Sequence, residues 1–119
     1  MPLSPLTEQA RAVAREKAVA ARTHRQDIKQ KLSDRTLSVR EVLDMVDSDP
    51  VLAKMPVDQM LRALPGIGAV RAQSIMSDLD IAPSRRLGGL GVHQRRKMVE
   101  FFNRNARLLN RARRNRPQS

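Results

Sequence analysis

The sequence predicts an all-α protein, in which one long N-terminal helix precedes a compact helical domain. Apolar residues recur at helical spacing along most of the chain, and no run of β-branched and aromatic residues alternates as in a strand. Proline and glycine fall between the periodic segments, where they end helices. A length of 119 residues suits one domain. We expect a basic helix over residues 1–35, a compact domain over 36–110 and a disordered basic tail over 111–119.

The composition favours a polyanionic partner and excludes several other classes of protein. Lysine and arginine number 23 against 12 acidic residues, which gives a net charge of +11. Cysteine is absent and there are only two histidines, His24 and His93, so we expect no catalytic thiol, no metal site and no cofactor. No apolar run approaches the roughly 18 residues of a membrane span, and the N-terminus has no secretion signal. These features predict a cytoplasmic protein that does not contact membranes.

The scarcity of aromatic side chains indicates which polyanion is bound. Phe101 and Phe102 are the only two aromatic residues of the sequence. Proteins that bind single strands stack the bases on several exposed rings, which this chain lacks. We therefore expect it to recognise a duplex through its backbone.

The first helix is expected from Leu6 to Leu32, with an apolar and a cationic stripe. At about 100° per residue, apolar side chains fall on a stripe about 100° wide that should pack on the domain: Leu6, Ala10, Val13, Ala21, Ile28 and Leu32. Five cations with no acid among them share another stripe, about 80° wide. These cations are Arg11, Arg15, Arg22, Arg25 and Lys29. One interpretation of the stripe is a solvated face, and the other is a set of secondary DNA contacts.

The middle of the chain carries a helix-start signal and half of the acidic residues. Ser38 and Glu41 have the spacing of a capping box, in which each side chain accepts the other residue's backbone N–H. Residues 33–64 carry six acidic and four basic groups, so this part is nearly neutral. Four aspartates lie close together in this part of the chain: Asp44, Asp47, Asp49 and Asp58. They are expected to cap helices or to face solvent, and the alternative is a protein-binding surface.

The most informative stretch, residues 61–75, resembles a helix-hairpin-helix motif. Proline disfavours helical geometry at the preceding Leu64, and the glycines on either side of Ile67 permit a tight turn. The second helix then begins with free backbone N–H groups and the positive end of its dipole, which together bind phosphate. The alternative is a plain Pro-Gly turn between core helices. The predicted DNA-binding residues here are Pro65, Gly66, Ile67, Gly68, Ala69, Val70 and Arg71.

A second candidate DNA-binding segment follows in the loop around Arg85 and Arg86. Leu87 and Leu90 should anchor this loop, and its glycines allow the backbone to lie close to another group. Paired arginines between apolar anchors suit phosphates or a minor groove, although a surface loop with incidental charge is the alternative. A last helix is expected from Val92. The predicted contacts in this part are Ser84, Arg85, Arg86, Gly89 and Arg95.

With these motifs the sequence resembles the actinobacterial integration host factor family over residues 3–102. The resemblance is carried by residues 3–21, 52–55, 64–68, 75–76 and 81–87, together with Gly89-Leu90-Gly91. It implies a helix-two-turn-helix domain, also found in a small-subunit ribosomal protein. It further implies a nucleoid-associated protein that binds double-stranded DNA with little sequence preference, bends and compacts it, affects supercoiling and supports site-specific recombination. Recombinase or topoisomerase machinery would then be the protein partners, and we expect a monomer.

Two other function classes compete with this hypothesis. A ribosomal or structured-RNA-binding protein of the same fold would share the basic tail, and a preference for RNA over DNA duplexes would identify it. A helix-hairpin-helix glycosylase would need a catalytic lysine or aspartate behind the hairpin. Asp78 and Asp80 instead fall at a predicted helix end, and no lysine lies between Lys54 and Lys97. We therefore expect no enzymatic activity.

Overall fold

The computed structural model describes residues 5–114, with the side chains of residues 7–106, and every regular element among them is helical. Two one-turn 3₁₀ helices, η1 (Val46–Ser48) and η2 (Leu87–Gly89), separate some of the α-helices. The all-α prediction is therefore confirmed. The six α-helices are α1 (Pro5–Ser33), α2 (Val39–Met45), α3 (Pro50–Ala53), α4 (Val57–Ala63), α5 (Ala69–Asp78) and α6 (Val92–Arg114).

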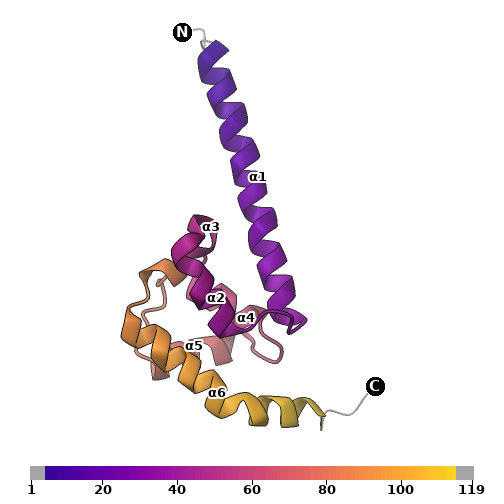
Figure 1. Ribbon diagram of the computed structural model, residues 1–119, viewed down its shortest axis with the longest axis vertical. Coiled ribbons are helices and arrows are strands. Elements are labelled where there is room, and N and C mark those ends of the chain that lie inside the picture. The colour runs from indigo at the N-terminus through magenta and orange to yellow at the C-terminus, as the bar shows by residue number, and fades with distance from the viewer. Residues whose placement is uncertain (1–4, 115–119) are drawn as a thin grey trace.

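Helix α1 lies against the other helices only near its C-terminal end, and the rest of it projects away from them (Figure 1). Ile28 and Leu32 are buried, whereas the Val13 side chain is 48% exposed. The radius of gyration is 17.7 Å, compared with roughly 13.5 Å for a compact domain of this length. The prediction that the whole apolar stripe packs on the domain was wrong: Ala10 is exposed and Ala21 half-buried, and the Leu6 side chain lies outside the described residues. A periodic stripe shows that a helix is amphipathic but not how far its partner extends.

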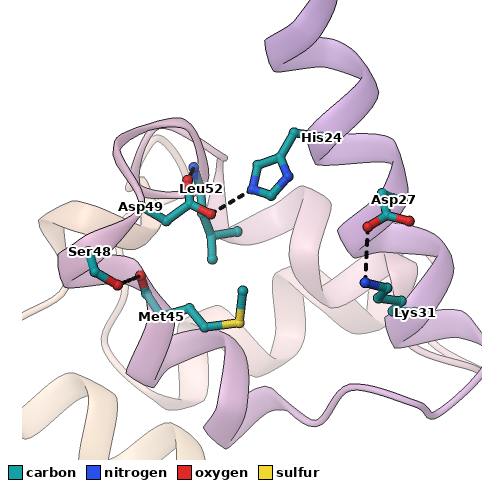
Figure 2. A network of polar contacts seen from close by, with 7 residues as sticks. All are labelled: His24, Asp27, Lys31, Met45, Ser48, Asp49 and Leu52. Carbon is teal, nitrogen blue, oxygen red and sulfur yellow. Dashed lines mark hydrogen bonds and ion pairs between the residues drawn. The ribbon is translucent and has the colours of Figure 1, made fainter.

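One polar contact joins α1 to the short helix α3, as Figure 2 shows. Nε2 of His24 donates a hydrogen bond to a carboxylate oxygen of Asp49 at 2.6 Å. Asp49 also caps α3 by accepting the backbone N–H of Leu52 at 3.0 Å. Burial raises the pKa of Asp49, but the hydrogen bonds from His24, Leu52 and Val51 and the electrostatic attraction of His24 together lower it by more, so the carboxyl ionises below its ordinary pKa. An ionised Asp49 therefore fixes α3 and the base of α1 together.

The core of the domain is one apolar cluster to which the short helices all contribute. The predicted capping box starts α2: the Glu41 backbone N–H donates to the Ser38 hydroxyl, and the Ser38 backbone N–H donates to the Glu41 carboxylate. Apolar side chains from all the short helices and from α6 are buried in one cluster. The fully buried members include Val42, Leu52, Met55, Val57, Met60, Leu61, Leu87 and Met98.

The last helix, α6, passes the predicted domain boundary at Asn110 and ends at Arg114. Four residues expected in a disordered tail are thus helical, while residues 115–119 lie outside the described part of the chain. Met98 anchors the helix in the core, and Phe101 and Phe102 are half-buried with their rings edge to face at 5.2 Å. The aromatic residues therefore serve packing.

The partial packing of α1 predicts different costs for two truncations along its apolar stripe. Replacing the buried Ile28 with alanine should lower the free energy of unfolding by about 2–5 kcal/mol, because a cavity opens in the core. Val13→Ala should change it by less than about 0.5 kcal/mol, because the side chain already faces solvent. Urea denaturation measures both. Equal costs would show that α1 packs along its whole length.

Candidate nucleic-acid interface

The turn between α4 and α5 has the geometry that the hairpin motif predicts. Helix α4 ends at Ala63, and Leu64 takes extended backbone angles, φ −71° and ψ 143°, before Pro65. Gly66 has φ +79°, a left-handed conformation that other residues rarely adopt. Ile67 is buried, with an exposed fraction of 5%. The turn is therefore fixed by a proline, a left-handed glycine and one apolar anchor.

Gly68 differs from the prediction, because its backbone does not need a glycine. Its φ of −93° and ψ of −175° are ordinary extended angles. A Cβ atom built there would have no neighbour within 4 Å. Gly68 instead leaves the start of α5 without a side chain that could cap it.

The N-terminus of α5 is an uncapped, exposed helix end. No side chain caps it, its first turn contains no acidic residue, and the Ala72 N–H donates to the Gly68 carbonyl at 2.9 Å. Val70 is 86% exposed, and Ala69 and Arg71 are also exposed. The first-turn N–H groups, the positive end of the dipole and the Arg71 charge together favour an anion at this place.

The arginine loop is held to the start of α4 through its backbone. The Val57 N–H donates to the Arg85 carbonyl at 3.0 Å, and the Leu87 N–H donates to the Met55 carbonyl at 2.9 Å. Pro56 and Arg86 form an isolated antiparallel bridge between these bonds. Ser84, Arg85 and Arg86 are all exposed, while Leu87 is fully buried. The loop therefore presents its arginines from a fixed backbone.

Two glycines in this loop have separate structural roles. A Cβ at Gly88 would lie 2.9 Å from the Cβ of Ala53, so this position must remain glycine for η2 to pack on α3. A Cβ at Gly89 would lie 3.1 Å from Cδ of Arg85, and a guanidinium nitrogen of Arg85 donates to the Gly89 carbonyl at 3.1 Å. Gly89 thus orients Arg85.

The two predicted segments lie at opposite ends of α4. The arginine loop is bonded to Met55 and Val57 at the start of α4, and the turn follows its last residue, Ala63. Seven helical residues between them correspond to a separation of about 10 Å along the helix. This is comparable with the major-groove width of about 12 Å. The sequence could not show this separation, because it depends on the pairing of the loop with α4.

The Arg95 side chain forms hydrogen bonds within the domain. Its guanidinium donates to both carboxylate oxygens of Asp47, at 3.1 and 3.2 Å, and its Nε donates to the Leu90 carbonyl at 3.2 Å. These bonds connect α6 to η1 and to the end of η2. The structure therefore brings Arg95 together with a structural carboxylate rather than with the turn.

Most of the aspartates in the middle of the chain have partners among the described residues. Asp49 caps α3, in agreement with the expected role of these aspartates. Asp47 accepts hydrogen bonds from Arg95, and Asp58 forms an ion pair with Arg62 at 2.7 Å. Asp58 also accepts a hydrogen bond from Gln73 at 3.3 Å. The sequence predicts caps in this segment, but spacing alone does not reveal these cationic partners.

The cationic stripe of α1 spans both the projecting and the packed part of the helix. Arg11, Arg15 and Arg22 are exposed, whereas Arg25 and Lys29 are half-buried. Over the described residues, no cluster of His, Cys, Asp and Glu could hold a metal ion. None of the helices described is long and apolar enough to span a membrane.

Comparison with known proteins identifies the class of this fold. The family model for the S13-like H2TH domain matches residues 32–102. A solved structure, described as sIHF bound to an 8-bp palindromic DNA, is 41% identical with a TM-score of 0.72. The match covers 73% of this chain and 98% of the solved chain. The chain is thus a helix-two-turn-helix protein.

Two curated relatives give the particular family. The integration host factor of Mycobacterium tuberculosis is 48% identical over 102 residues, which cover 86% of this chain and 97% of the relative. The integration host factor of Mycolicibacterium smegmatis is 47% identical over 102 residues, with the same shares of both chains covered. The chain therefore belongs to the actinobacterial integration host factor family, as the sequence motifs predicted.

The different geometries of the two turn glycines predict opposite effects on stability. Gly66→Ala should lower the free energy of unfolding by about 1–2 kcal/mol, because alanine must then adopt the left-handed conformation. Gly68→Ser should raise it by a few tenths of a kcal/mol, because serine caps the helix and meets no neighbour. Urea denaturation tests both. A destabilising Gly68→Ser would contradict the open geometry at this position.

Proposed function

We propose that this chain is an architectural protein that binds double-stranded DNA through its phosphates. The observation that carries the proposal is the uncapped, acid-free N-terminus of α5, exposed beside the anchored turn. The arginine loop at the other end of α4 adds two exposed cations on a fixed backbone. The solved relative described as bound to an 8-bp DNA supports the choice of ligand.

The chemistry of these groups favours binding with little dependence on sequence. Backbone N–H groups and arginines that meet phosphates position a protein on a duplex but do not read bases. Two anion-binding points at opposite ends of α4, the start of α5 and the arginine loop, would hold a duplex in a defined orientation. DNA bending and compaction, effects on supercoiling and support of site-specific recombination belong to this proposal, as do a nucleoid location and recombinase or topoisomerase partners. We propose a monomer without catalytic activity.

The interface that we propose consists of the turn, the first turn of α5 and the arginine loop. Its residues are Pro65, Gly66, Gly68, Ala69, Val70, Arg71, Ser84, Arg85 and Arg86. Ile67 and Gly89 act indirectly, since Ile67 is buried and Gly89 orients Arg85. Arg95 is committed to Asp47 and is assigned a structural role.

The double charge reversal Arg85→Glu with Arg86→Glu should weaken binding of a duplex and flatten its salt dependence. If each arginine meets one phosphate, affinity at 0.1 M salt falls roughly 60-fold and the slope of log K against log salt by about 1.8. Fluorescence anisotropy over a series of salt concentrations measures both quantities.

The matched control is Arg96→Glu with Lys97→Glu. Both side chains are exposed on α6, outside the groove that Pro65 and Ile67 line, and the change in net charge is the same. An equal loss of affinity in the control would remove the arginine loop from the interface. Tighter binding of an RNA duplex of matched length would instead favour the structured-RNA hypothesis.

A further inference from the structure

A polar cleft lies between the packed end of α1 and helix α4. It has a volume of about 470 Å³. Its walls contain two cations, three glutamine side chains and one hydroxyl group, and no carboxylate. The lining residues are Gln26, Lys29, Gln30, Ser33, Gln59, Arg62 and Ala63.

Lys29 is an unmatched cation at this place. It is half-buried, and among the described residues no hydrogen bond or ion pair engages the side chains of Lys29, Gln26 or Gln59. Arg62 donates to Asp58 at 2.7 Å, which leaves other N–H groups of its guanidinium available. A half-buried cation beside amide donors favours an anionic ligand that completes the arrangement.

The cleft lies next to the anchored turn. Ala63, the last residue of α4, lines the cleft and directly precedes Leu64 of the turn. On the other side of this junction, Leu32 in the last turn of α1 and Arg35, two residues after that helix, line one groove with Leu64, Pro65 and Ile67. Figure 1 likewise shows the end of α1 next to the loop between α4 and α5. A strand bound at the turn would therefore pass close to the cleft.

We propose that this cleft is a further phosphate-binding site, which takes a phosphodiester group of the duplex held at the turn. Lys29 and Arg62 supply charge, and the side-chain amides of Gln26 and Gln59 donate hydrogen bonds to the phosphate oxygens. Asp58 positions Arg62 through its ion pair. This inference rests on the proposed function and extends the interface from the domain to the base of α1.

The chain offers a closely matched pair of substitutions to test the cleft. Lys29→Gln removes a charge from the cleft, and Lys31→Gln removes the same charge two residues away. About 200° of helix rotation separates the two side chains, and Lys31 pairs with Asp27 at 3.1 Å. Neither change should alter the fold, which circular dichroism and the melting temperature verify. Lys29→Arg retains the charge and should retain the affinity.

The experiment measures duplex DNA binding by fluorescence anisotropy across salt concentrations. Loss of one phosphate contact in Lys29→Gln should lower affinity about eightfold at 0.1 M salt and reduce the salt slope by about 0.9. Lys31→Gln should leave the slope unchanged. Equal behaviour of the two variants would overturn the cleft site while leaving the proposed function intact. Failure of the wild-type protein to bind the duplex would overturn both.

Discussion

The burial of Ile67 in the turn between α4 and α5 is the constraint on which the candidate interface depends. A left-handed Gly66 allows the chain to reverse within a few residues, and the Ile67 side chain anchors that reversal in the core. With this anchor in place, α5 begins at a fixed position and its first N–H groups face solvent. Were Ile67 to leave the core, the N-terminus of α5 would lose its orientation although every interface residue would remain in the chain.

Helix α4 fixes the distance between the turn and the arginine loop. One of its ends holds the turn, and the other holds the arginine loop through backbone hydrogen bonds from Val57 and to Met55. Its exposed side contributes Arg62 to the cleft beside α1. Three groups that favour anions are thus arranged around one seven-residue helix. Because all of them address the backbone of a nucleic acid, their spacing matters more than their individual chemistry.

Local sequence rules predicted the helices and the turn between α4 and α5. They did not predict the features that depend on contacts between residues far apart in the sequence. Pro65 and the Ser38 capping box act on their neighbours in the chain, so the helix boundaries that they specify were found correctly. The exposed half of α1, the ion pair of Arg95 with Asp47 and the cleft residue Arg62 depend on which elements meet in space. Spacing along the sequence contains no signal for these contacts.

The most direct test of where the duplex binds is a map of backbone amide NMR shifts during titration with a short DNA duplex. Amide NMR resonances of residues 66–71 and 84–86 should shift most, because phosphates bind at the start of α5 and at the arginine loop. Those of the acidic segment around Asp44 should change little. Shifts concentrated on α2 and η1, with residues 66–71 unaffected, would contradict the claim that the anchored turn holds the nucleic acid.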